Sequence, residues 1–121
     1  MIGLILAAHT AVVYFLITTQ PHERGFVVGI SDPATIAQAR KLIHEGQSRI
    51  VTGIIATNQA PYNVPWGFHY LPNTVRLADM TTEVCDATAT YVQAHLKDVG
   101  KDFLPDNRWC PWHTRLVREV R

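Results

Sequence analysis

Short runs of β-branched and aromatic residues recur along this chain, and they do not alternate strictly with helical segments. Such runs, bounded by Gly, Pro, Asn and Asp, are typical of strands. The segments that we expect to be strands are 11–19, 24–30, 49–56, 66–71, 75–77 and 116–120. Strands grouped in this way predict a single α+β domain with a mostly antiparallel sheet.

Two helical segments are expected between these strands. Ser31 or Asp32 caps the first one, because Pro33 suits the first helical position and apolar residues follow at helical spacing. The second helix is expected over about residues 80–98, with Asp79 as its cap. The sequence therefore predicts two helices packed against the sheet.

The composition excludes several classes of protein. The 121 residues fit one domain with one ordinary core. Hydrophobic residues make up 47% and charged residues 17%, which excludes a disordered chain. The net charge is +1 and no basic stripe is visible, so we expect no binding to nucleic acid.

The N-terminal run is apolar from Met1 to Ile17 except at two positions. It is shorter than the ~20 residues that a spanning helix needs, so no stable membrane span is expected. No basic residue precedes Arg24, whereas a full signal peptide begins with a basic region. Residues 1–8 are therefore either a signal-peptide remnant or an apolar tail of a domain over 9–121. The first alternative predicts an extracellular or periplasmic protein.

Several short motifs resemble those of one domain family. They are Ile30-Ser-Asp-Pro33, Ala60-Pro61-Tyr62-Asn63, Glu83-Val84-Cys85-Asp86-Ala87-Thr88, Phe103-Leu104-Pro105, Trp109-Cys110-Pro111-Trp112 and Arg115-Leu116-Val117-Arg118-Glu119. Together they are similar to the N-terminal domain of a slime-mould calmodulin-binding protein and its bacterial relatives. The resemblance implies no particular reaction, and calmodulin binding belongs to the founding protein. Many bacterial members are secreted, which supports the signal-remnant hypothesis.

The two cysteines, Cys85 and Cys110, leave three alternatives open. A chain reversal after the second predicted helix would bring them together in a disulfide worth roughly 3 kcal/mol. The second alternative is two buried thiols. The third is a reactive thiol at Cys110 with His113 as its base, although no orienting third group is evident.

The histidines give no metal signal. None of the six forms the i, i+4 pair of a helical zinc motif, so we expect no metal and no other cofactor. His69 alternates with the aromatic residues Trp66, Phe68 and Tyr70, which would let its imidazole point into a cleft. This residue is the second place at which an enzyme hypothesis can begin.

Two Pro-containing loops are rich in aromatic residues. Such residues either fill the core or form a rigid recognition surface, since Trp, Tyr and Arg dominate binding hot spots. The predicted binding residues are Tyr62, Asn63, Trp66, His69, Arg108, Trp109, Trp112 and His113. The surface would combine the 59–66 loop with the 108–113 segment.

The preferred hypothesis is a small secreted, non-enzymatic binding module whose partner is a protein, for example a protein that it inhibits. One alternative is a small enzyme that uses Cys110 with His113, or His69 in a cleft. Another is a structural domain that acts only inside larger relatives.

Overall fold

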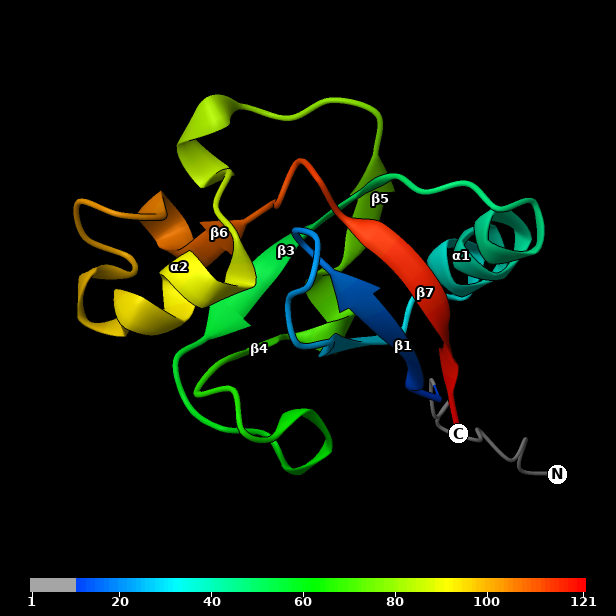
Figure 1. The fold of residues 1–121 in the computed structure, drawn as a ribbon, viewed down its shortest axis with the longest axis horizontal. Helices are drawn as coiled ribbons and strands as arrows, with labels where there is room; N and C mark the ends of the chain where they lie inside the picture. Colours follow the sequence, from blue (N-terminus) through cyan, green and yellow to red (C-terminus); the bar gives the residue numbers. More distant parts are fainter. Residues whose placement is uncertain (1–10) are drawn as a thin grey trace, which may run out of the picture.

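Two antiparallel sheets form the centre of the molecule in the computed structural model, which describes residues 11–121 (Figure 1). The first sheet has the order β2-β1-β7 and consists of β1 (Val13–Thr18), β2 (Phe26–Ile30) and β7 (Arg115–Val120). In the second, β3 (Ile50–Ala56) pairs with β4 (His69–Tyr70), β5 (Arg76–Ala78) and β6 (Arg108–Trp109). The predicted α+β class with antiparallel pairing is confirmed.

The N-terminal predictions are only partly open to inspection. The signal-remnant hypothesis for residues 1–8 lies outside the described residues. Within residues 11–121, no helix has the length and apolar character needed to cross a membrane.

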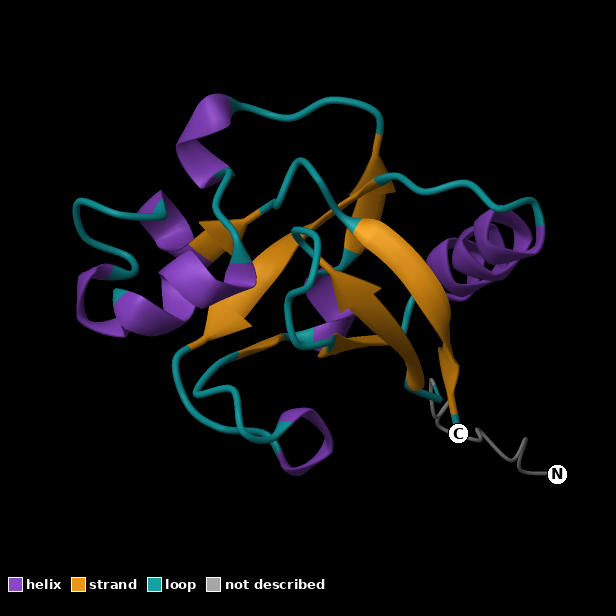
Figure 2. Cartoon of the chain, viewed as in Figure 1, coloured by secondary structure: helices purple, strands orange, loops and turns teal. Residues whose placement is uncertain are grey.

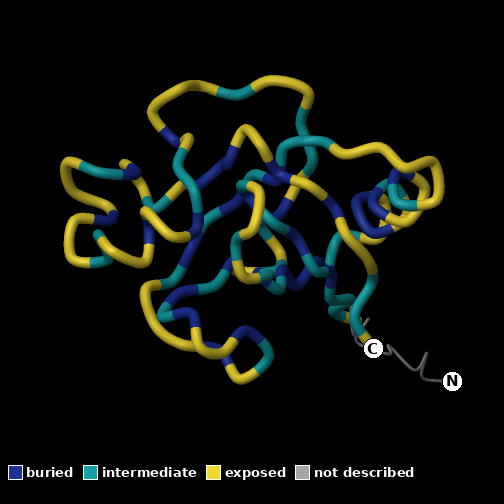
Figure 3. Tube along the Cα trace, in the orientation of Figure 1, coloured by how far each residue is buried: buried dark blue, intermediate teal, exposed yellow. Residues whose placement is uncertain are grey.

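One hydrophobic core joins the two sheets. Alternating residues of β1, such as Phe15 and Ile17, are fully buried, as period-two patterning requires. Phe26 of β2 meets the second sheet, because its ring lies 5.1 Å from Trp109 and 6.0 Å from Tyr70. Buried positions accordingly concentrate along the central strands, and exposed ones along the outer loops (Figure 3).

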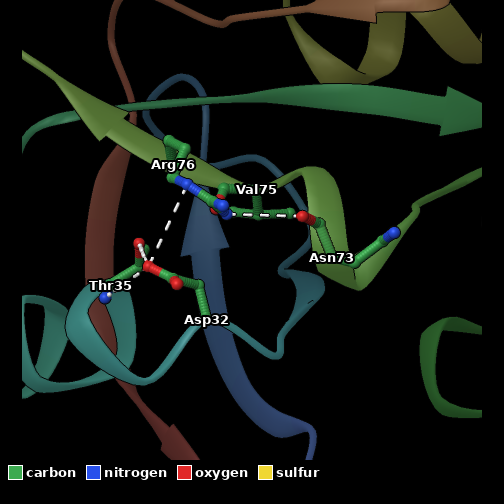
Figure 4. Close-up of polar contacts among 5 residues, drawn as sticks. All are labelled: Asp32, Thr35, Asn73, Val75 and Arg76. Carbon is green, nitrogen blue, oxygen red and sulfur yellow. Dashed lines mark hydrogen bonds and ion pairs between the residues drawn. The ribbon is translucent and has the colours of Figure 1, made fainter. Parts of the chain in front are cut away.

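The first helix forms much as its local sequence predicts. Helix α1 (Pro33–His44) begins after Asp32, whose carboxylate accepts hydrogen bonds from the Thr35 amide at 3.1 Å and the Thr35 hydroxyl at 2.6 Å. The Thr35 hydrogen bonds lower the pKa of Asp32. Arg76 of β5 lies 3.9 Å from the same carboxylate and also donates to the Val75 carbonyl, so α1 is joined to the second sheet (Figure 4).

The prediction of a long second helix is wrong. Helix α2 spans only Ala89–Ala94, and short 3-10 turns at Glu83–Cys85 and Leu96–Asp98 flank it. The helix cannot begin earlier, because Ala87 gives its carbonyl to the Trp109 indole N–H at 2.8 Å rather than to a helical turn. The cap is therefore Thr88, which accepts from the Tyr91 amide at 3.1 Å.

The two helices lie at opposite ends of the molecule, with the strands between them (Figure 2). Strand β6 is a further difference from the prediction, which placed a loop over residues 101–113. Trp109 pairs with Gly53 of β3, so this part of the chain belongs to the second sheet. The predicted strand over 66–71 shrinks to His69–Tyr70.

Glu23 joins the β1–β2 turn to the start of α2. Its carboxylate accepts from the Thr19 amide at 3.0 Å, and from the amide and hydroxyl of Thr90 at 3.1 and 2.8 Å. The Thr19 hydroxyl in turn accepts from the Ala89 amide at 2.8 Å. Burial raises the pKa of Glu23, but the hydrogen bonds from Thr19 and Thr90 outweigh it and leave the pKa lowered.

We predict that Glu23 makes the fold sensitive to acid. A lowered folded-state pKa stabilises the protein above the unfolded value near 4.5, and this contribution is lost as pH falls through the folded pKa. Glu23→Gln should reduce the urea midpoint at about pH 6 and have less effect in acid, where the wild-type carboxyl is protonated. Glu45→Gln, at the exposed end of α1, is the control. The same loss for Glu23→Gln at every pH would contradict the assignment.

Candidate binding surface

The disulfide between Cys85 and Cys110 fixes one end of the molecule. The two Cα atoms lie 5.2 Å apart, both residues are buried, and the Cys110 amide donates to the Cys85 carbonyl at 2.8 Å. The bridge joins the 3-10 turn before α2 to the segment that follows β6. Of the three alternatives for the cysteines, the disulfide is the one that forms. Cys110 therefore has no free thiol for His113 to activate while the bond is intact.

Trp112 follows the disulfide and is held in one position on the surface. Its amide donates to the Asp86 carboxylate at 2.9 Å, and its indole N–H donates to the Thr82 carbonyl at 3.2 Å. A turn closed by the Thr114 amide on the Pro111 carbonyl fixes the backbone on the other side. The side chain is nevertheless 36% exposed, so the bonds orient the indole without burying it.

Two exposed apolar side chains accompany Trp112. Met80 is 83% exposed and lines a hollow of about 140 Å³ together with Trp112. Val84 is 61% exposed and lies in the 3-10 turn next to Thr82, which accepts the indole hydrogen bond. We call Met80, Val84 and Trp112 the Trp112 patch.

Polar groups border the Trp112 patch. An adjoining hollow of about 230 Å³ contains Arg49 and Asp79, which form an ion pair. Thr81 lines the first hollow, and its buried hydroxyl has no hydrogen-bond partner among the described residues. Such a surface can hold an apolar side chain beside charged and hydrogen-bonding groups.

The predicted binding residue Asn63 is a buried clamp. Its side-chain oxygen accepts from the Val27 amide at 2.7 Å, and its side-chain nitrogen donates to the Phe68 carbonyl at 3.1 Å. The side chain is only 2% exposed. Asn63 thus attaches the 59–66 loop to β2 and does not lie on the molecular surface.

The other predicted residues of this loop are also largely engaged within the fold. The Trp66 indole is buried and donates to the Gly25 carbonyl at 2.9 Å. Half-buried Tyr62 packs on Tyr14 with ring centroids 4.6 Å apart, and burial, with a smaller effect of Tyr14, raises the pKa of Tyr62. His69 packs its edge against Tyr62, and its Nδ1 lies 2.9 Å from the Asn58 carbonyl oxygen.

The predicted residues near the second cysteine divide into core and surface. Trp109 is fully buried in the core. Arg108 is exposed and donates to the Thr52 hydroxyl at 3.2 Å. His113 is exposed and lines a hollow separate from that of Trp112.

The two predicted loops do not form one surface. The 59–66 loop and the 110–114 segment lie on opposite sides of the strands (Figure 1). Trp66 borders a different groove, of about 430 Å³, beside Arg24 and Gln93. Sequence reasoning found Trp112 but missed Met80 and Val84, because both were assigned to a helix that does not form there.

The comparisons with known proteins identify the family. The family model of the N-terminal domain of a calmodulin-binding protein matches residues 11–121. The chain belongs to this N-terminal domain family. Searches of curated proteins and of solved structures gave no match. The matched part of this N-terminal domain includes both sheets, the disulfide and the Trp112 patch.

The described part of this family member shows no metal centre. Among residues 11–121, no three side chains of His, Cys, Asp or Glu come close enough together to hold a metal ion.

We predict that the disulfide stabilises both the fold and the Trp112 patch. The double substitution Cys85→Ser and Cys110→Ser should lower the free energy of unfolding by about 3 kcal/mol, because it releases a loop of this length in the unfolded state. Chemical denaturation measures the loss, and acrylamide quenching of the exposed indole should increase. Unchanged stability, or alkylation of the native protein before reduction, would contradict the bridge.

Asn63 should contribute to stability rather than directly to recognition. Asn63→Ala leaves the Val27 amide and the Phe68 carbonyl without their partner, so we expect a loss of about 2 kcal/mol in urea denaturation. Substitution of the exposed neighbour Val64 by Ala is the matched control and should cost much less. An Asn63→Ala protein as stable as the control would show that these bonds contribute little.

Proposed function

We propose that this domain is a secreted, disulfide-stabilised binding module that holds a protein partner against the Trp112 patch. The observation that carries the proposal is the exposed Trp112 indole, fixed by a disulfide on one side and by hydrogen bonds to Asp86 and Thr82. A tryptophan held in its binding orientation loses little conformational entropy when a partner covers it. Tryptophan is also among the residues that contribute most to protein interfaces.

The surroundings of Trp112 support a protein as the partner. Met80 and Val84 enlarge the apolar area, and methionine adapts its shape to a partner's side chains. The adjoining Arg49–Asp79 pair offers one charge of each sign at the rim. Apolar centres bordered by polar groups are characteristic of protein interfaces.

The disulfide also supports secretion. Structural disulfides persist in oxidising compartments and are rare in the cytosol. The proposal is therefore an extracellular or periplasmic protein, and fractionation of the producing cells tests this part. The enzyme hypothesis has less support, since the bridge occupies Cys110 and the Nδ1 atom of His69 lies against the Asn58 carbonyl.

Site-specific photo-cross-linking tests the partner surface. A benzoylphenylalanine at Met80 or Val84 should capture one protein from the extracellular or periplasmic fraction. The same residue at Tyr91, which is 51% exposed on α2, is the control and should not capture it. Equal capture at all three positions would indicate non-specific contact and overturn the surface.

The captured partner then allows a measurement of affinity. Trp112→Ala should weaken binding by about 30-fold, the effect of a typical hot spot, while Tyr91→Ala should leave it unchanged. Circular dichroism checks that both variants are folded. Unchanged affinity of a folded Trp112→Ala protein would contradict the proposal.

A further inference from the structure

A second hollow lies on the other side of the β6–β7 loop from the Trp112 patch. Its volume is about 390 Å³, and three segments that are distant in sequence contribute to it. The lining residues are Thr18, Gln20, Pro21, His22, His113 and Arg115. Thr18 of β1 and Arg115 of β7 are direct neighbours across the sheet, so their side chains leave the same face.

The charge of this hollow is not neutralised from within the fold. Arg115 has no carboxylate within 4.0 Å among the residues that the structure describes. His22 and His113 are both exposed, and each adds a positive charge when it is protonated. Arginine, two imidazoles, a hydroxyl and an amide thus surround one space, and all of them can donate hydrogen bonds.

The carboxylates on neighbouring elements are engaged elsewhere. Glu23, in the same turn as His22, accepts bonds from Thr19 and Thr90. Asp86 accepts from the Trp112 amide. Glu119, further along β7, forms a two-bonded pair with Arg40 of α1.

The backbone at His22 supports a role for this side chain. Its φ is +61°, a left-handed conformation that glycine adopts with less strain. The turn is fixed in part by the Gln20 amide, which donates to the Glu23 carboxylate at 3.2 Å. A side chain retained where glycine would be less strained is a pointer to function.

We propose that this hollow binds an oxyanion of the sulfate or phosphate class. Arg115 supplies the permanent charge and two parallel donors, which match the geometry of these anions. His22 and His113 add charge-assisted hydrogen bonds from the two loops, and Thr18 and Gln20 add neutral ones. The proposal is independent of the protein partner, because His113 and its neighbour Trp112 line different hollows.

The proposed site should bind more tightly in acid. Histidine side chains take up protons between about pH 8 and pH 5, whereas arginine stays charged throughout. Sulfate also keeps its charge over this range. A change in sulfate affinity with pH therefore reports on His22 and His113, since Glu23, Asp86 and Glu119 are bound to other groups.

Sulfate titration of the folded protein, followed by NMR at constant ionic strength, tests the proposal. Saturable shifts are expected at His22, His113 and Arg115, with affinity about tenfold weaker at pH 7.5 than at pH 5.5. Arg115→Gln should abolish saturation. Arg118→Gln, on the same strand but outside the lining of the hollow, is the matched control and should retain it.

Two further variants separate the roles of the histidines. Asparagine tolerates the left-handed backbone, so a protein with His22→Asn and His113→Asn should remain folded. It should bind sulfate with little dependence on pH. Full pH dependence in this variant, or saturable binding in Arg115→Gln, would overturn the assignment, as would shifts that grow linearly with sulfate in the unmodified protein.

A second ligand identifies the source of the anion. Glucosamine 6-sulfate carries the same group on an organic body. Tighter binding of this ester than of inorganic sulfate would indicate that the site recognises an esterified sulfate, and equal or weaker binding would indicate the free ion. Failure of the Trp112 cross-linking leaves these measurements unaffected, so the two proposals are tested separately.

Discussion

The buried indole of Trp109 is the interaction on which most of the structure depends. It stacks on Tyr70 with centroids 5.0 Å apart and meets Phe26 of the first sheet edge-on. Its N–H bonds the Ala87 carbonyl, and its own carbonyl accepts from the Tyr70 hydroxyl at 3.2 Å. One side chain therefore connects both sheets with the segment that leads into α2. It also precedes Cys110, so the disulfide begins from a fixed position.

Glycine makes this packing possible at one position of β3. Gly53 lies opposite Trp109 in the sheet, and a Cβ atom there would lie 2.9 Å from the Tyr70 ring. The absence of a side chain leaves the space that the stacked rings need. The close approach of Tyr70 to β3 follows, and with it the packing that keeps Trp109 fully buried.

The sequence predicts those parts of the fold whose causes are local. Helix α1 could be predicted because its cap, its proline and its apolar stripe all lie within the same dozen residues. The second helix could not, because the Ala87 carbonyl is taken by an indole and Cys85 by a bridge, both from residues more than twenty positions away. The site shows the same limit: local patterns identify the tryptophans, but only long-range packing buries Trp66 and Trp109 and leaves Trp112 exposed.

The order of the strands has a consequence for biosynthesis. Strand β1, near the N-terminal end of the described chain, has β2 on one side and β7 on the other, so its second edge is covered by residues made much later. An emerging chain thus carries an unpaired, apolar strand edge until β7 has been synthesised. Folding can then be completed only after translation, which makes the interval before β7 arrives the stage most prone to aggregation.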